Sequence, residues 1–274
     1  MTISDHESHS EKWISEGPVL LEYADGIATL ALNRPDASNS MNIALMQSLH
    51  GAVMMCHRDP RVRVVVLQGA GANFCAGGDV REFAAMGEGL GDFLKEVTAY
   101  LQMAVGALVR LDAVVVTKVQ GYAAGGGGLG LVCASDIVIA GTSAKFMGGA
   151  TRVGMAPDGG ASVVLPKLVG FRRAMEILLS NRIVAADEAA EIGLITRMVA
   201  DEDLEAEVAT TASRLARGAP LAQAATKRLL WNGIGVESCL SEEARTVSTL
   251  SATADAREGL AAVMERRKPS FVGR

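Results

Sequence analysis

The chain has 274 residues, of which 49% are apolar and 21% are charged, which is the composition of a folded globular protein. The formal net charge is −5, and only 4% of the residues are aromatic. These values exclude a basic surplus that would hold nucleic acid and argue against a surface on which bases stack. We therefore expect no nucleic-acid partner.

The sequence also indicates neither export nor membrane insertion. The first residues, MTISDHESHSEKW, have no basic region followed by an apolar one, so we expect no secretory signal. The uncharged run between Lys118 and Asp136 is too short and too rich in glycine to span a membrane. The four cysteines are far apart and form no Cys-x-x-Cys motif, which favours reduced thiols over disulfides or a zinc site. We expect a cytoplasmic protein with no membrane partner and no metal.

The first part of the chain predicts strands that alternate with helices. Residues 1–16 are polar, and we expect a disordered lead there. The stretch VLLEYADGIATLAL predicts two strands joined by a turn at Asp25 and Gly26. Apolar residues at helical spacing predict a helix over 41–58, which Pro60 would end. The stretch VRVVVLQG then predicts a buried strand, ANFCAGGDV a loop, and residues 80–110 mainly helix.

The middle and end of the chain complete the predicted organisation. The strand AVVVTKV is followed by a glycine run, a short helix and the strand DIVIAG, which together form a crossover unit typical of an α/β fold. After a loop at TRVGMAPDGG we expect short helices and the strand LITRMV. From residue 201 the pattern is helical, and its last segment begins at Asp255 with Glu258 in the pattern of a capping box. We expect an α/β core over 17–200 and a helical region over 201–274.

The glycine run, GYAAGGGGLGLVCASD, lies where a strand meets a helix. The first turn of a helix has unpaired N–H groups and a partial positive charge, and glycines let a ligand atom approach them closely. Such a place can hold an anion, or a carbonyl oxygen that becomes one during a reaction. Tight packing between helix and strand is the alternative reason for the glycines.

A dinucleotide site is a second alternative for the glycine run. Gly125, Gly127 and Gly130 fit the pattern Gly-x-Gly-x-x-Gly between a strand and a helix, as in an NAD-dependent dehydrogenase. The acidic residue expected at the end of the next strand is absent, because DIVIA leads to GTSAK. A phosphate-binding P-loop is excluded because no Gly-Lys pair occurs in the sequence.

A second strand-to-helix turn, NFCAGGDV, offers another free N–H group, and two such turns can converge on one oxygen. Together with LNRPDASNSMN, VGMAPDGG and DAREGLAAVMERRKPSF, these stretches resemble, in unbroken order over residues 18–271, the crotonase or enoyl-CoA hydratase/isomerase superfamily. The resemblance implies an α/β fold with a repeated β-β-α spiral core. It also implies a C-terminal helical region that assembles a homotrimer, or a hexamer of two trimers.

The resemblance further implies an acyl-CoA substrate and no permanently bound cofactor, with coenzyme A entering as part of the substrate. Two backbone N–H groups would polarise the thioester carbonyl and stabilise the enolate. By position these belong to Gly78 and to Gly127 when counted back from Asp136, whereas counting forward from Gly121 gives Gly126. The residues that the resemblance places at the coenzyme A moiety are Asp36, Ala37, Ser38, Ala76, Asp79, Val80, Lys268 and Phe271.

Hydratases of this family use two glutamates, and the corresponding positions here are Gly130 and Ala150. Efficient hydration is therefore doubtful, since it needs one group to activate water and another to protonate carbon. One carboxylate remains in a suitable loop, Asp158 of APDGG, although Pro-Asp-Gly is also turn and helix-cap chemistry. The isomerase branch that acts on oxepin-CoA and 3,4-enoyl-CoA has a similar aspartate, as does the 4-chlorobenzoyl-CoA dehalogenase branch.

The dehalogenase branch also uses a histidine and a tryptophan, but residues 80–112 contain no histidine and the tryptophan position is Ala150. An isomerase needs only one carboxylate, so we expect a double-bond isomerase that uses Asp158. A hydratase, a dehalogenase or hydrolase of the same family, and an acyl-CoA-binding protein without catalysis stay open. Four carboxylates that follow the second turn could assist the reaction or lie in solvent: Glu82, Glu88, Asp92 and Glu96.

Overall fold

The computed structural model describes residues 10–232 and 236–269. Strands β2 (Val19–Ala24) and β3 (Ile27–Leu32) pair antiparallel across a tight turn in which Asp25 and Gly26 have positive φ, which confirms the hairpin. Strand β1 (Glu11–Ile14) pairs with β2, so the expectation of disorder is wrong for this segment. The ring of Trp13 in β1 stacks on Tyr23 with centroids 5.1 Å apart, which explains the pairing. Residues 1–9 of the expected lead lie outside the described residues.

The main sheet has seven strands in the order β1-β2-β3-β4-β5-β7-β10, and its strands from β3 onward are parallel. Its other strands are β4 (Val64–Gly69), β5 (Val114–Val119), β7 (Ile137–Gly141) and β10 (Arg197–Val199). A small second sheet contains β6 (Tyr122–Ala124), β8 (Lys145–Met147) and β9 (Val184–Ala185). The expected α/β fold is confirmed.

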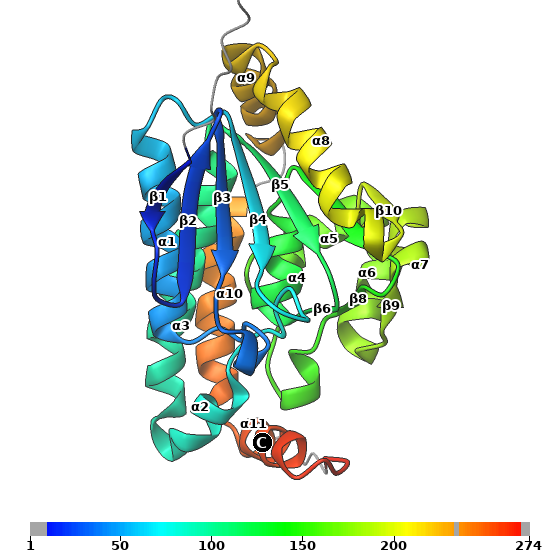
Figure 1. Cartoon of the computed structure of the whole chain (residues 1–274). Coiled ribbons are helices and arrows are strands. Elements are labelled where there is room, and N and C mark those ends of the chain that lie inside the picture. The colour runs from blue at the N-terminus through cyan, green and yellow to red at the C-terminus, as the bar shows by residue number, and fades with distance from the viewer. Residues whose placement is uncertain (1–9, 233–235, 270–274) are drawn as a thin grey trace, which may run out of the picture.

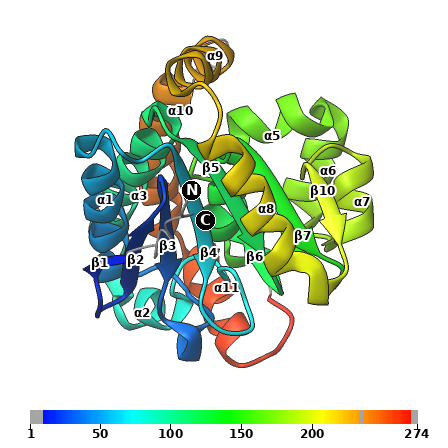
Figure 2. The same ribbon diagram turned by 45° about the horizontal axis from the view of Figure 1, so that its top comes forward.

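Helices connect the parallel strands and cover both faces of the main sheet. They are η1 (Pro35–Ala37), α1 (Ile43–Arg58), α2 (Val80–Ala85), η2 (Gly87–Gly89), α3 (Leu90–Arg110) and α4 (Gly125–Cys133). Val65 and Leu67 of β4 face the large core beneath α1, α3 and α4, whereas Val64 and Val66 face α8 (Leu204–Ala216) on the other side. This alternation gives β4 two buried faces, as its unbroken apolar sequence predicts (Figures 1 and 2).

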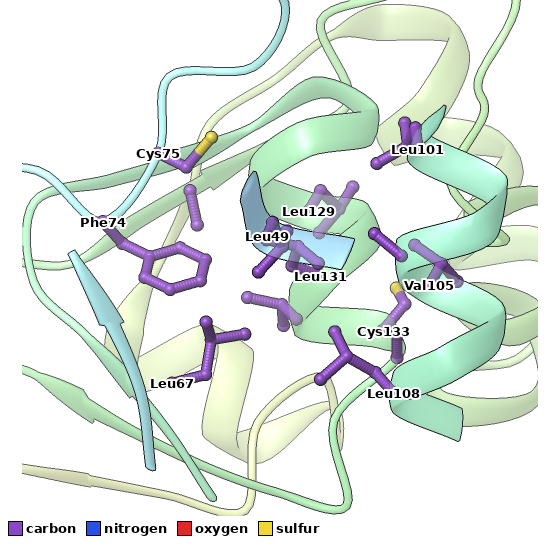
Figure 3. Packing of buried hydrophobic residues seen from close by; sticks show 14 of the residues in the cluster. Leu49, Leu67, Phe74, Cys75, Leu101, Val105, Leu108, Leu129, Leu131 and Cys133 are labelled. Atoms are coloured by element: carbon purple, nitrogen blue, oxygen red, sulfur yellow. The ribbon is translucent and has the colours of Figure 1, made fainter. Parts of the chain in front are cut away.

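The glycine-rich helix α4 lies inside the large core. Figure 3 shows its residues Leu129 and Leu131 among Leu67 of the sheet and Leu101 and Leu108 of α3. All five side chains are at most 4% exposed. Helix α4 is thus fixed by packing on several sides, although its first four residues are glycines without side chains.

The chain after β8 is mainly helical. Its remaining elements are η3 (Thr151–Val153), α5 (Ala161–Val169), α6 (Phe171–Ser180), α7 (Ala186–Glu191), η4 (Asp201–Asp203), α9 (Pro220–Asn232), α10 (Val236–Ser251) and α11 (Ala254–Met264). Helix α10 packs along α3, and α11 packs beside α2 and η3 (Figure 1). The capping box expected at Asp255 is wrong, because Thr253 caps α11 by accepting a hydrogen bond from Ala256 N at 3.1 Å. Within the described ranges, no helix is both long enough and apolar enough to cross a membrane.

Candidate active site

Three loops that follow neighbouring parallel strands meet at one end of the sheet. They span residues 33–42 after β3, 70–79 after β4 and 120–124 after β5, the last of which includes the short strand β6, and each leads toward a helix. The arrowheads of β3 and β4 in Figure 1 point toward this end, where α2 and α11 also lie. Ligands of α/β sheets usually bind at the carboxyl ends of the strands. A cavity of about 820 Å³ lies here, and all three loops contribute to its wall.

Side-chain amides hold the first two loops together. The Asn39 amide donates to the carbonyls of Ala70 and Asn73 at 2.9 and 2.8 Å, and its own oxygen accepts from Arg34 N at 2.8 Å. The Ala76 N–H donates to the Ser38 carbonyl at 3.0 Å. Ser38 and Asn39 adopt left-handed φ angles of 52° and 53°, which turn the chain sharply at this contact. The loop around Ser38 is therefore fixed against the loop that contains Gly78.

The backbone around Gly78 is fixed by Met41. Met41 N donates to the Gly77 carbonyl at 2.7 Å, and Asp79 N donates to the Met41 carbonyl at 3.0 Å, which is the pattern of a parallel β-bridge. Successive peptide groups of an extended segment point in opposite directions, so the Gly78 N–H points away from Met41. Gly78 lines the cavity. A Cβ atom at Gly78 would lie 2.5 Å from the Phe83 ring, which explains why this position has no side chain.

An ion pair between Arg34 and Asp79 also joins the first two loops. Arg34 Nη2 lies 3.0 Å from Asp79 Oδ2, and Arg34 Nη1 donates to the Ser40 carbonyl. The other oxygen of Asp79 accepts from Glu82 N at 3.4 Å and caps α2. Arg34 thus connects the loop after β3 with the residue that follows Gly78. Sequence reasoning missed Arg34 and Met41, although both lie in the stretch LNRPDASNSMN, because their roles depend on contacts between separate loops.

The glycine run forms the first turn of α4, whereas the sequence predicted that the helix would begin after it. Its N-cap residue is Ala124, which has no side-chain oxygen and makes no capping hydrogen bond. A capping side chain would normally accept from the second or third helical N–H, here those of Gly126 and Gly127. Both residues, together with Gly125, line the cavity. The uncapped helix end therefore directs backbone donors at the cavity, with the positive end of the helix dipole.

Asp158 lies directly against this helix end. A Cβ atom at Gly126 would be 1.5 Å from Asp158 Oδ1, so the carboxylate occupies the space that any other residue at position 126 would fill. Gly159 and Gly160 have φ angles of 62° and 82°, which confirms the turn chemistry expected after Pro157. The backbone of Gly159 also packs on α4, since a Cβ atom at Gly159 would be 2.7 Å from the Gly126 carbonyl.

The two positions where hydratases carry glutamates differ in their surroundings. Gly130 is buried under the loop of Asp158, and a Cβ atom there would lie 3.1 Å from the Gly159 carbonyl. Ala150 lines the cavity and brings no polar group to it. The loop that contains Ala150 is held by Asn181, whose side-chain oxygen accepts from Gly149 N at 2.8 Å.

Four carboxylates line the cavity, and they are Asp36, Asp79, Glu82 and Asp158. Of the four residues considered after the second turn, only Glu82 belongs to the wall, while Glu88, Asp92 and Glu96 are exposed. Burial raises the pKa of Glu82 above its usual value, and the neighbouring Asp79 raises it further, whereas Arg34 opposes the shift. Glu82 therefore favours its protonated form more than an exposed glutamate does.

The residues expected at the coenzyme A moiety fall into two groups. Six of them line the cavity, and they are Asp36, Ala37, Ser38, Ala76, Asp79 and Val80. Lys268 is exposed beyond the end of α11 and does not belong to the cavity wall of this chain. Phe271 lies outside the described residues.

The far wall of the cavity is apolar. It is formed by α3 with Leu94, Val97 and Leu101, by Val247 of α10 and by Val263 of α11. Behind the helix end, the thiol of Cys75 is fully buried, and burial raises its pKa to about 12, which disfavours the thiolate form that acts as a nucleophile or metal ligand. No group of histidine, cysteine and acidic residues that could hold a metal occurs among the described residues.

Comparison with known proteins agrees with this geometry. The profile of the enoyl-CoA hydratase/isomerase family matches residues 22–274. The chain belongs to the enoyl-CoA hydratase/isomerase family. A probable enoyl-CoA hydratase of Rhodobacter capsulatus is 38% identical over 255 residues, which cover 92% of this chain and 97% of that protein. The 1,2-epoxyphenylacetyl-CoA isomerase of Escherichia coli is 34% identical over 268 residues, covering 93% and 98%.

Both branches that the sequence resembles are represented among the relatives of this family member. A 4-chlorobenzoyl coenzyme A dehalogenase of an Arthrobacter species is 32% identical over 237 residues, which cover 85% of each chain. The crystal structure of an enoyl-CoA hydratase from Mycobacterium avium subsp. paratuberculosis has a TM-score of 0.86 at 32% identity and covers 94% of this chain and 100% of its own. The crotonase fold expected from the sequence is thereby confirmed.

Proposed function

We propose that this family member is a double-bond isomerase of enoyl-CoA thioesters, with Asp158 as the group that moves the proton. The observation that carries the proposal is the contact between the Asp158 carboxylate and the bare backbone of Gly126, at an uncapped helix end that faces the substrate cavity. A carboxylate and a set of backbone donors then lie beside the same small volume. This is the combination that formation of a thioester enolate requires.

The N–H groups of Gly78 and Gly127, with that of Gly126 beside the latter, would donate hydrogen bonds to the thioester carbonyl oxygen. Asp158 would remove a proton from C2 of a 3-enoyl thioester, and the electron pair would spread over C2, C4 and the oxygen as a dienolate. Return of a proton to C4 gives the 2-enoyl thioester. Each backbone donor of such a site contributes roughly 10²–10³-fold to turnover.

The cavity walls support an acyl-CoA as the substrate. The polar wall around Asp36–Ser38 and Ala76–Val80 would hold the coenzyme A moiety, and the apolar wall of α3 would receive the acyl chain. Coenzyme A enters as part of the substrate, and we propose no permanently bound cofactor.

Hydration is the second candidate, because relatives such as the Rhodobacter capsulatus protein are named as probable hydratases. Against it, Gly130 and Ala150 cannot transfer protons, and Gly159 packs where a longer side chain at position 130 would extend. The histidine and tryptophan expected for dehalogenation are missing, since α2 and α3 contain no histidine and Ala150 stands at the tryptophan position. Isomerisation needs the fewest groups, because a single carboxylate can take a proton from one carbon and return it two carbons away.

We also propose that the chain assembles as a trimer or a pair of trimers. Large apolar side chains are exposed on α6, where Phe171 is 70% and Leu179 is 61% exposed, and on α9, where Leu221 is 85% exposed. Cyclic association is a common way to cover such surfaces. A monomer mass by light scattering at micromolar concentration would contradict this assembly.

The proposed function is tested by offering the full-length protein a 3-enoyl-CoA and crotonyl-CoA in separate reactions followed by NMR. We expect conversion of the 3-enoyl-CoA to the conjugated 2-enoyl-CoA and slow or absent hydration of crotonyl-CoA. Rapid hydration with no isomerisation would reverse the assignment. Retention on a coenzyme A affinity column with neither reaction, and with no hydrogen exchange at C2, would favour a binding protein.

A further inference from the structure

Among the described residues, no hydrogen bond or ion pair of the Glu82 side chain accounts for its place in the cavity wall. Its oxygen Oε2 is buried, and no hydrogen-bond partner for it exists among the residues that the structure describes. Glu82 also lines the cavity. Buried polar atoms are nearly always satisfied, so an orphaned carboxylate oxygen beside a ligand cavity points to a group that acts on the ligand.

Glu82 cannot make the hydrogen bond that a glutamate at this position of a helix usually makes. Asp79 and Glu82 are spaced as a capping box, in which the glutamate would accept from the N–H of the capping residue. Only half of the box forms, because Asp79 caps Glu82 N whereas Asp79 N donates to the Met41 carbonyl at 3.0 Å. The bridge that fixes Gly78 thus takes the N–H that would otherwise hold Glu82.

The neighbouring charges do not neutralise Glu82 either. The guanidinium of Arg34 is engaged by the Asp79 carboxylate and by the Ser40 carbonyl. Burial and the charge of Asp79 both raise the pKa of Glu82. A carboxyl group in these surroundings holds a proton more readily than an exposed glutamate, which suits a general acid.

We propose that Glu82 is a second catalytic carboxyl group, which protonates the far end of the dienolate that Asp158 forms. This inference rests on the proposed isomerisation. Asp158 takes the proton from C2 as the C2–H bond breaks, and the C2–C3 double bond forms. Protonated Glu82 gives its proton to C4 as the C3–C4 double bond is lost, so no net oxidation occurs. Asp158 is then protonated and Glu82 ionised, and exchange with water restores both groups.

Isotope transfer distinguishes one carboxylate from two. A 3-enoyl-CoA deuterated at C2 is converted by the full-length protein in ordinary water, and C4 of the product is examined by NMR. If Glu82 supplies the proton, C4 receives protium from solvent and the deuterium removed by Asp158 is lost. Deuterium found at C4 would show that Asp158 alone carries the proton from one carbon to the other, and it would overturn the inference.

The matched substitutions are Glu82→Gln, which keeps the size of the side chain, and Glu88→Gln, an exposed carboxylate just beyond the same helix. Glu82→Gln should lower kcat by about 10²–10⁴-fold with little change in KM, whereas Glu88→Gln should leave both unchanged. The melting temperature of Glu82→Gln at neutral pH should stay the same or rise, because glutamine replaces a carboxyl group whose ionisation the folded state disfavours. Wild-type turnover in a folded Glu82→Gln protein would overturn the role of Glu82 while the proposed isomerisation stands. Absence of isomerisation in the wild type would overturn both.

Discussion

Replacing Gly126 by alanine separates catalysis from folding at the centre of the site. The added Cβ atom would lie 1.5 Å from Asp158 Oδ1 and 2.4 Å from its Cγ. Ordinary carbon contacts begin near 3.5 Å, so the carboxylate must move by about 2 Å. A misplacement of about 1 Å can cost 10²-fold in rate, and loss of a general base costs about 10²–10⁴-fold. We therefore expect Gly126→Ala to lower kcat by at least about 10²-fold.

The same substitution should be mild for stability, because the atoms that must give way belong to the end of a movable side chain. Overpacking of this kind typically costs about 1–3 kcal/mol. The matched control is Gly51→Ala in the exposed middle of α1, where the new methyl group meets nothing within 4 Å. It should stabilise the fold by about 0.5–1 kcal/mol and leave turnover unchanged. Turnover on a 3-enoyl-CoA and a thermal melt are measured for both variants, and wild-type kcat in Gly126→Ala would refute the assigned position of Asp158.

Three further substitutions test the donor, the core and the orphaned carboxylate. Gly78→Pro and Gly78→Ala both bring an atom against the Phe83 ring, but only proline removes the N–H group. We expect kcat/KM measurements to show that Gly78→Pro stabilises the transition state by about 3–4 kcal/mol less than Gly78→Ala. Equal activity of the two variants would place the donor elsewhere. Lys227→Met should destabilise the fold by up to about 3–5 kcal/mol in urea unfolding, because it removes the cation 2.8 Å from the largely buried Asp136, which then keeps the hydrogen bonds from Val115 N and Trp231 Nε1. Arg228→Met, from an exposed pair, should cost less than about 1 kcal/mol, and similar losses in the two variants would contradict the burial argument. Burial and the charge of Asp79 raise the pKa of Glu82 in the folded state, and Arg34 opposes this shift without cancelling it. Between pH 4.5 and the raised pKa, the folded protein binds more protons at Glu82 than the unfolded chain does, so the protein loses stability as the pH rises through this range. Glu82→Gln should therefore be more stable than wild type at neutral pH and should lose that advantage near pH 4.5 in melting curves.

The sequence predicts the fold well because its signals are local. The unbroken apolar run of β4, the Asp25–Gly26 turn and the long apolar periodicity of α3 each indicate their element without help from distant residues. One error arises because a contact with another strand decides the outcome, since β1 is held by the stacking of Trp13 on Tyr23. The other error is local, because Thr253, which directly precedes α11, caps the helix in place of Asp255.

The site residues also divide into those that short motifs indicate and those that only contacts between separate loops reveal. Gly78, Asp158 and the glycine run could be identified from short motifs, and the structure brings them to one cavity. Arg34 and Met41 could not, because their hydrogen bonds join loops after different strands. Glu82 could be selected from its exposed neighbours only after the structure showed that Met41 occupies the N–H that a capping glutamate would use.

The central claim is that Asp158 moves the proton of a bound enoyl thioester, and Asp158→Asn tests it most directly. Asparagine keeps the size of the side chain and loses its basicity. The measurement is the rate of isomerisation of a 3-enoyl-CoA, with deuterium exchange at C2, the dissociation constant of the thioester and the melting temperature determined on the same samples. We predict that isomerisation and exchange both fall by about 10²–10⁴-fold while binding and melting change little. Isomerisation at the wild-type rate in a folded Asp158→Asn protein would contradict the claim.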